Sequence, residues 1–196
     1  MLSLLQKLDI QIFFLINSKL KNPVFDVIMP FITNTKNFYV IFLVVFLYLL
    51  FLEKKKGKVV ALATVVSVVF SDILSSKVLK HLINRPRPFM VLDEVVKMVS
   101  AAGPSMPSSH AVNSFTVATI FMLFYRKNVV EEKNALRYFV RKYFIGIICY
   151  FFAFLSAYSR VYVGVHFPSD VVVGAVIGIL FGWLTYKLTI VLAQNG

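Results

Sequence analysis

The chain has 196 residues, of which 59% are hydrophobic and only 15% are charged. This much apolar surface cannot be hidden inside a water-soluble globule of that length, so the composition indicates a membrane protein and excludes a cytosolic enzyme or a disulfide-rich secreted scaffold. The formal net charge of +12 suits anionic lipid or an anionic substrate. We expect no nucleic acid partner, because few of the basic residues lie away from membrane segments.

The N-terminal segment is apolar but interrupted by polar side chains. Residues 4–20 contain Lys7 and Asp9, and residues 23–32 contain Asp26. Interruptions of this kind predict two interfacial or partly inserted helices instead of full spans.

Five longer apolar runs follow, and each predicts a transmembrane helix. They extend over residues 38–52, 59–70 with a polar continuation to about 82, 111–125, 143–158, and 171–186 with a tail to 193. Most of their uncharged cores are shorter than the roughly 20 residues that span hydrocarbon, so we expect their polar ends to reach the interface. The predicted fold class is an all-α integral membrane helical bundle of about five to six transmembrane helices with N-terminal interfacial helices. We expect a single domain over residues 1–196, in which residues 1–36 form the N-terminal helices and 37–196 the transmembrane core.

Lysine and arginine are concentrated in two connections between predicted spans, residues 53–58 and 126–142. Because cytoplasmic loops carry an excess of these residues, both connections should be cytoplasmic. The other two loops, 80–110 and 159–170, then face the periplasmic or extracellular side.

The first outward loop opens with KHLINRPRP, residues 80–88. Its two prolines should end the preceding helix and keep the chain extended, which presents Arg87 on a stiff segment just beyond Lys80. An ammonium and a guanidinium group together suit a phosphate. Alternatively, Lys80, Arg85 and Arg87 are interfacial anchors whose charged ends reach the membrane surface.

The same loop ends with GPSMPSSH, residues 103–110. Pro107 followed by Ser108 and Ser109 is typical of a helix N-terminus, so His110 should lie in the first turn of a transmembrane helix. Free backbone N–H groups there attract an anion. Simple capping beside an interfacial histidine is the alternative interpretation.

The second outward loop reads SRVYVGVHFPSD, residues 159–170. His166 and Asp170 are four residues apart at a predicted helix start, so the carboxylate can reach one imidazole nitrogen and leave the other with a lone pair. This arrangement makes a nucleophile or a base. The pair is also a common structural hydrogen bond, and a carboxylate near a helix N-terminus is favourable without catalysis.

Taken together, the three motifs resemble the signatures of the type 2 phosphatidic acid phosphatase (PAP2) family of membrane lipid phosphatases. They are Lys-x6-Arg-Pro from Lys80, Pro-Ser-x-His from Pro107, and Ser-Arg-x5-His-x3-Asp from Ser159, in this order and beside hydrophobic helices. One departure is Ser109, where the family has glycine. Because glycine lets a backbone approach phosphate closely, Ser109 affects the expected loop geometry and substrate range.

The resemblance implies a role for each motif residue. His166 is the nucleophile that forms a phosphohistidine, Asp170 orients it, and His110 protonates the leaving group and then activates water. The residues implied to bind the phosphoryl oxygens are Lys80, Arg87, Ser108, Ser109 and Arg160.

Two further interpretations concern acidic side chains. His110, His166 and Asp170 could form a two-histidine, one-carboxylate metal site, but the surrounding cations would repel a dication, so we expect metal-independent catalysis and no cofactor. Asp72 lies inside a predicted span, where an acid is a functional candidate by default. We expect it to make an interhelical hydrogen bond or to pair with Lys77.

An outward mouth between helices predicts a lipid phosphate or diphosphate as substrate, with its tails in the bilayer. The resemblance implies an enzyme of the bacterial inner membrane that acts on undecaprenyl diphosphate or lipid A 1-phosphate, with phosphatidylglycerophosphate or phosphatidic acid as alternatives. A lipid phosphotransferase would use the same phosphohistidine. A non-catalytic anion-binding or transport protein would need neither His110 nor His166, and the soluble haloperoxidases that share a similar pocket lack hydrophobic spans.

Overall fold

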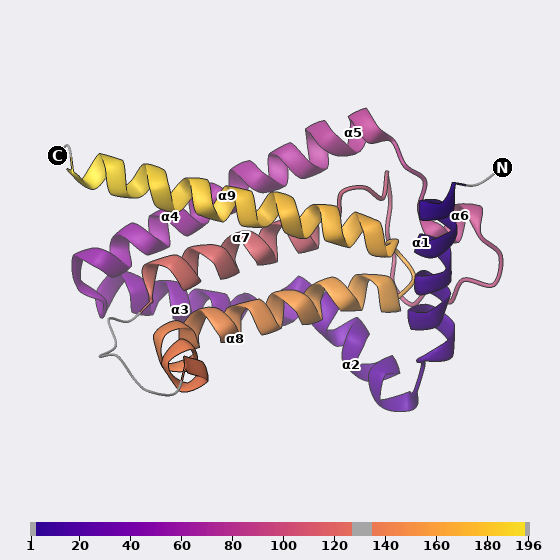
Figure 1. Ribbon diagram of the computed structural model, residues 1–196, viewed down its shortest axis with the longest axis horizontal. Coiled ribbons are helices and arrows are strands. Elements are labelled where there is room, and N and C mark those ends of the chain that lie inside the picture. The colour runs from indigo at the N-terminus through magenta and orange to yellow at the C-terminus, as the bar shows by residue number, and fades with distance from the viewer. Residues whose placement is uncertain (1–2, 127–134, 195–196) are drawn as a thin grey trace.

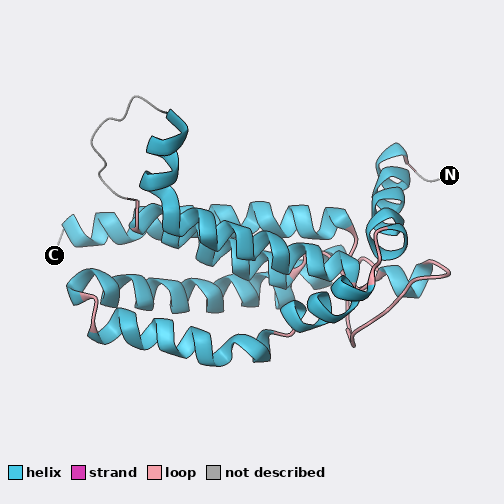
Figure 2. Ribbon diagram, turned by 90° about the horizontal axis from the view of Figure 1, so that it is seen from below, coloured by secondary structure: helices cyan, strands magenta, loops and turns pink. Residues whose placement is uncertain are grey.

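The computed structural model describes residues 3–126 and 135–194, and every regular element in those ranges is helical (Figure 2). The elements are α1 (Leu4–Phe14), the π-helical turn η1 (Leu15–Lys19), α2 (Pro23–Thr33), the 3-10 turn η2 (Thr35–Phe38), α3 (Tyr39–Phe51), α4 (Lys54–Ile73), the π-helical turn η3 (Leu74–Leu79), α5 (Lys80–Ile83), α6 (Pro88–Val91), α7 (Ser109–Phe124), α8 (Ala135–Tyr162) and α9 (Pro168–Gln194). The predicted all-α class is confirmed.

The long helices α3, α4, α7, α8 and α9 run along one direction, and α1 crosses their ends (Figure 1). The short helices α5 and α6 lie at the same end of the bundle as α1, whereas the turn between α3 and α4 lies at the opposite end. The crosswise orientation of α1 agrees with the interfacial helix predicted for residues 4–20.

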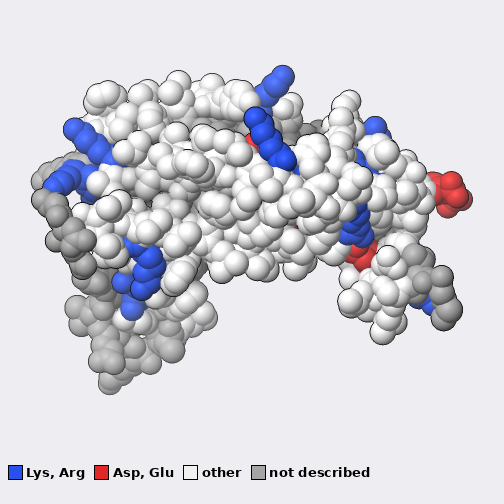
Figure 3. Space-filling model, turned by 90° about the horizontal axis from the view of Figure 1, so that it is seen from above, with Lys and Arg blue, Asp and Glu red and all other residues white. Residues whose placement is uncertain are grey.

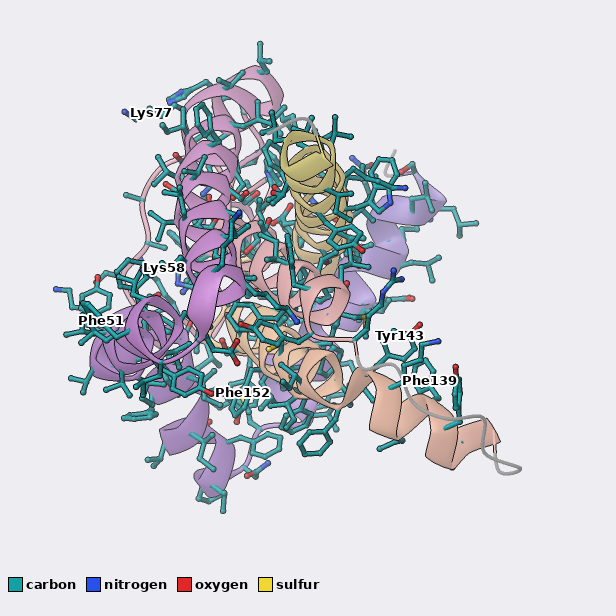
Figure 4. The ribbon with its side chains drawn as sticks, turned by 90° about the vertical axis from the view of Figure 1, so that its left-hand side faces the viewer. Phe51, Lys58, Lys77, Phe139, Tyr143 and Phe152 are labelled. Carbon is teal, nitrogen blue, oxygen red and sulfur yellow. The ribbon has the colours of Figure 1, made fainter. Side chains whose placement is uncertain are left out.

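Three helical segments are long and apolar enough to cross a membrane, namely Lys55–Val91, Lys142–Tyr162 and Pro168–Leu192. Only 28%, 33% and 17% of their most apolar windows is buried within the bundle, so most of that surface faces outward. A broad uncharged surface covers most of one face of the molecule (Figure 3), and the aromatic rings of Phe51 and Phe139 project away from the helices (Figure 4). An apolar exterior of this extent is suited to lipid, not to water.

Two of the predicted spans are less regular. Helix α2 and the segment Thr35–Phe51 pass the test for a span only as a pair, and they are bent by 74°. Helix α7 is apolar but has only 16 residues. It lies at the centre of the bundle, where it packs against α4, α8 and α9.

Glycines let α9 approach α7 closely. Gly174, Gly178 and Gly182 follow one another at every fourth position of α9. A side-chain carbon at any of them would collide with a backbone carbonyl group of α7 or of its N-cap, Ser108. Small residues at this spacing are typical of tightly packed membrane helices. The stripe therefore fixes the start of α9 against the start of α7.

The N-terminal segment is attached to the two loops of residues 80–110 and 159–170 by Asn17, which is fully buried. Its side-chain amide donates to the carbonyl oxygens of Val96 and Tyr162, over 2.9 and 2.8 Å, and its side-chain oxygen accepts from the Val96 N–H. These three bonds join parts of the chain that are far apart in the sequence. They hold these parts together at one end of the bundle.

Some predicted boundaries were wrong. The prolines of residues 80–88 do not both extend the chain, because Pro88 begins helix α6, a position that suits a residue with no N–H to donate. The four lysines of residues 53–58 all lie in the first turns of α4 and not in a loop. Most of the predicted 126–142 connection is either outside the described residues, as for 127–134, or part of α8.

Candidate active site

The loops of residues 80–110 and 159–170 are bound to each other through their backbones. The N–H of Met98 donates to the carbonyl of Val163 over 3.1 Å. Beside it, Gly164 has a φ of +80°, and a side chain there would collide with the carbonyl of Val96. A left-handed glycine thus allows the turn before His166 to lie directly on the first loop.

His166 lies in that turn and is only 2% exposed, and Asp170 in the first turn of α9 is fully buried. The Nδ1 atom of His166 is 3.5 Å from Oδ2 of Asp170, and its Nε2 atom is 3.3 Å from Nη1 of Arg87. Because a guanidinium group can only donate, Nε2 must be the nitrogen with the lone pair and Nδ1 the one with the proton. The nitrogen that can attack is therefore the one beside Arg87.

The charge state of His166 follows from its surroundings. Burial, and after it the positive charges of Arg160, Arg87 and Lys80, lower the pKa of His166 well below its ordinary value. The imidazole is therefore neutral near pH 7, which a nucleophile requires. The same effect shows that the predicted cations lie close enough to His166 to act on it.

Arg87 is 3% exposed and is held by backbone carbonyl groups of both loops. Its Nε donates to Gly103, its Nη2 to Ala102 and its Nη1 to Val165, each over 2.9 Å. Three such bonds fix the plane of the guanidinium group next to the imidazole.

Thr33, at the end of α2, connects two further predicted site residues, Arg160 and His110. Nη1 of Arg160 donates to the hydroxyl of Thr33 over 2.6 Å, and Nε2 of His110 lies 3.1 Å from its carbonyl oxygen. Since a carbonyl only accepts, Nε2 of His110 carries a proton in this arrangement. The lone pair of His110 is then on Nδ1.

Helix α7 begins at Ser109 as predicted, but Ser108 does not cap it through its side chain. The Ser108 hydroxyl is buried and has no hydrogen-bond partner among the described residues, and the same holds for Nε of Arg160. Buried polar atoms normally have partners. Two such atoms on residues that were predicted to bind phosphate are consistent with an oxyanion site.

The side chain of Ser109 contacts η3. Its hydroxyl oxygen lies 3.2 Å from the hydroxyl of Ser75, in η3, which donates to it. The N–H of Ser109 belongs to the first turn of α7, where backbone donors have no partner within the helix. The residue that replaces the family glycine thus places its side chain against η3.

Three residues at the site were not predicted to have a role: Asp9, Arg85 and Thr33. Asp9 accepts from Arg85, and Arg85 also donates to Asp170. The signal that the sequence offered for Asp9 was an acid inside the apolar run of residues 4–20. No feature of the sequence indicated Thr33. Its carbonyl and hydroxyl reach His110 and Arg160 only because the chain bends after α2.

The intramembrane acid Asp72 makes the predicted interhelical hydrogen bond. Its Oδ1 accepts from Nδ2 of Asn113 over 2.9 Å, whereas Lys77 points away from the bundle (Figure 4). In the part of the chain that is described, no group of three His, Cys, Asp or Glu residues is arranged to hold a metal ion.

Comparison with known proteins gives a consistent result. The sequence model of the PAP2 superfamily matches residues 59–191. A lipid A 4'-phosphatase of Bacteroides thetaiotaomicron is 29% identical over 195 residues, which cover 95% of this chain and 79% of that protein. An undecaprenyl-diphosphatase of Sulfolobus acidocaldarius is 29% identical over 162 residues, or 82% of this chain and 69% of that protein.

Two solved structures share the fold. LpxE of Aquifex aeolicus has a TM-score of 0.67 and 32% identity, with 92% of this chain and 95% of that chain covered. A PAP2-type phosphatidylglycerolphosphate phosphatase of Bacillus subtilis has a TM-score of 0.71 and 25% identity, with 95% of this chain and 87% of that chain covered.

Proposed function

Because the chain belongs to the PAP2 superfamily, as its motifs predict, we propose that it is a membrane phosphatase that cleaves a lipid phosphate or diphosphate through a phosphohistidine. The observation that carries the mechanism is the buried His166, whose Nε2 lone pair lies beside the fixed guanidinium group of Arg87. We further propose that the active unit is one domain over residues 1–196.

In the first step, Nε2 of His166 attacks phosphorus and the bond from phosphorus to the leaving oxygen breaks. The phosphate takes the place of Nη1 of Arg87 at the lone pair of Nε2. Nη1 then donates to a phosphoryl oxygen instead. Asp170 faces the Nδ1–H and stabilises the positive charge that develops on the imidazole. His110 supplies the proton that the leaving oxygen needs from its Nδ1, which is protonated when the negatively charged phosphate is bound beside it.

In the second step, His110 removes a proton from water, which attacks the phosphohistidine and releases inorganic phosphate. Donors that surround the three equatorial oxygens stabilise both transition states. The donors we propose are Lys80, Arg87, Arg160, the hydroxyl of Ser108 and the N–H of Ser109. All the charge stabilisation comes from the protein, so the reaction as proposed needs no metal ion.

We infer that the substrate is lipid A phosphate or undecaprenyl diphosphate. Names of relatives support this inference, since a lipid A 4'-phosphatase and an undecaprenyl-diphosphatase are similar to most of the chain. The uncharged sides of the bundle also support it, because they let a lipid keep its tails in the bilayer while its headgroup reaches the site. Phosphatidylglycerophosphate is the alternative, supported by the fold of the Bacillus subtilis enzyme.

The experiment is phosphate release by the purified protein in detergent from lipid A, undecaprenyl diphosphate, phosphatidylglycerophosphate and phosphatidic acid. We expect release from lipid A or undecaprenyl diphosphate, unchanged by excess EDTA and abolished in His166→Asn. Activity that disappears with EDTA and returns with Mg or Zn would contradict metal independence. A phosphorylated alcohol in place of phosphate, when an alcohol acceptor is added, would identify a phosphotransferase.

We also propose that the site faces the outside of a bacterial inner membrane, because the lysine-rich start of α4 lies at the end of the bundle opposite to it (Figure 1). In a Cys149→Ala background, Lys58→Cys and Lys97→Cys can be treated with an impermeant thiol reagent in spheroplasts. Labelling of the cysteine at position 97 alone is expected. Labelling of the cysteine at position 58 alone would reverse the orientation.

A further inference from the structure

Asp9 is an acid from the N-terminal helix α1 that is buried beside the catalytic pair, 8% exposed. Its Oδ2 accepts from Nη2 of Arg85 over 2.6 Å, and its Oδ1 accepts from the N–H of Ser169 over 2.8 Å. The hydroxyl of Ser169 also donates to Oδ2. Asp9 therefore binds both the first outward loop and the N-terminus of α9.

Arg85 links Asp9 to the catalytic acid, Asp170. Its Nη1 donates to Oδ1 of Asp170 over 2.7 Å, and its guanidinium carbon lies 4.1 Å from the centre of the Phe167 ring. The second carboxylate oxygen of Asp170 accepts from the N–H of Phe167 and faces His166. Both oxygens of Asp170 are thus held, one of them by Arg85.

The charges in this group explain why a second acid is needed. With Arg85 alone, the positive guanidinium would cancel the negative charge of Asp170 and weaken its effect on His166. Asp9 gives Arg85 a second carboxylate, so that the three side chains together keep one negative charge next to the imidazole. In a buried site this difference is large, because the surrounding dielectric constant is low.

We propose that Asp9 and Arg85 are a positioning pair that fixes Asp170, and through it the reactive tautomer of His166; this rests on the function proposed above. Asp9 lies outside residues 59–191, the segment that matches the superfamily model. Helix α1 thus contributes a positioning residue to the active site and is not only a membrane anchor.

The test compares Asp9→Asn with Asp26→Asn. Asp26 is a matched control, since it also belongs to the N-terminal segment and accepts from Lys21 over 3.2 Å and from the hydroxyl of Tyr162 over 2.7 Å, away from the site. We expect kcat of Asp9→Asn to fall by about 10- to 100-fold with KM within about threefold, as for other groups that orient a reacting side chain. Asp26→Asn should keep kcat within about threefold.

A double-mutant cycle separates positioning from a general effect on stability. If Asp9 acts through the charge of Arg85, then Asp9→Asn should cost about threefold or less in kcat when Arg85→Gln is already present. Equal losses in both backgrounds, or equal losses in Asp9→Asn and Asp26→Asn at matched folded fractions, would overturn the proposal.

A second readout does not depend on turnover. Imidazole ¹⁵N chemical shifts of the full chain in micelles, assigned with His166→Asn, report which nitrogen of His166 is protonated. The wild-type signal should show the proton on Nδ1, and Asp9→Asn should show a mixture of tautomers. An unchanged tautomer in Asp9→Asn would overturn the positioning role, whether or not the wild type hydrolyses lipid. A wild type that hydrolyses no lipid would count against the proposed function alone.

Discussion

The two histidines of the site are held in different ways. His166 is enclosed, with a carboxylate at one ring nitrogen and a guanidinium group at the other. His110 is held at one nitrogen by the backbone carbonyl of Thr33. The position of His166 thus depends on a network of charges, and that of His110 on where helix α2 ends. Substitutions should therefore affect the two histidines in different ways.

The largest effect should come from His166→Ala, which removes the group that attacks phosphorus. We expect kcat/KM to fall on the order of 10³-fold or more with every substrate, including p-nitrophenyl phosphate. Rapid-quench experiments should find no phosphoenzyme. A phosphoenzyme in this variant would transfer the role of nucleophile to another residue.

The next largest effect should come from His110→Ala and should depend on the leaving group. With a lipid alcohol as leaving group, we expect a loss of about 10²-fold or more, because the oxygen needs a proton. With p-nitrophenyl phosphate, whose phenolate leaves unaided, the initial burst should be nearly normal. Phosphoenzyme should then accumulate, since the same residue activates water. Equal losses on both substrates would contradict this division of roles.

A smaller effect should follow from Thr33→Val, which removes the hydroxyl that binds Arg160 but keeps the carbonyl that holds His110. We expect KM for the lipid to rise about 10-fold, the value of one hydrogen bond to a charged group. A suitable control is Thr116→Val, because Thr116 is also buried but donates within its own helix, to Val112 over 2.8 Å. If both variants have the same KM for the lipid, the hydrogen bond from Arg160 to Thr33 does not help Arg160 to bind the phosphate.

The depressed pKa of His166 predicts a pH effect on stability. In the unfolded chain this histidine takes up a proton near pH 6.5. The folded protein does so only at lower pH, so the stabilising contribution is complete above pH 6.5. Below pH 6.5, the free energy of unfolding falls by up to about 1.4 kcal/mol per pH unit. The thermal midpoint in detergent should therefore fall between pH 7 and pH 5, and less steeply in His166→Asn. Parallel curves would contradict the burial of a neutral imidazole.

The smallest effect should be that of Ser109→Gly, which restores the residue usual in the family. Since the Ser109 hydroxyl contacts Ser75 and not the site, kcat/KM should change by about fivefold or less, the range of one neutral hydrogen bond. A larger change, or a new substrate preference, would mean that the serine side chain reaches the phosphate.

The sequence predicted the helical bundle and the helix starts near Ser109 and Pro168, because apolar runs and Pro-Ser pairs are local signals. It did not predict that Asp9 and Asp170 both bind Arg85. That arrangement depends on how α1 crosses the end of the bundle, which is a property of the packing and not of any short segment. The bend of 74° after α2, which brings Thr33 to Arg160, is likewise absent from the hydropathy pattern.

The shortness of the central helix has a consequence for the lipid environment. A helix of 16 residues is about 24 Å long, whereas the hydrocarbon layer of a bilayer is about 30 Å thick. If the far end of α7 reaches the opposite interface, its first turn, and His110 with it, lies several ångströms below the level of the headgroups. A phosphate must then be drawn into the membrane to meet the cations there, so a thicker bilayer should demand deeper immersion of the headgroup. Activity in vesicles should accordingly decrease as acyl chains are lengthened.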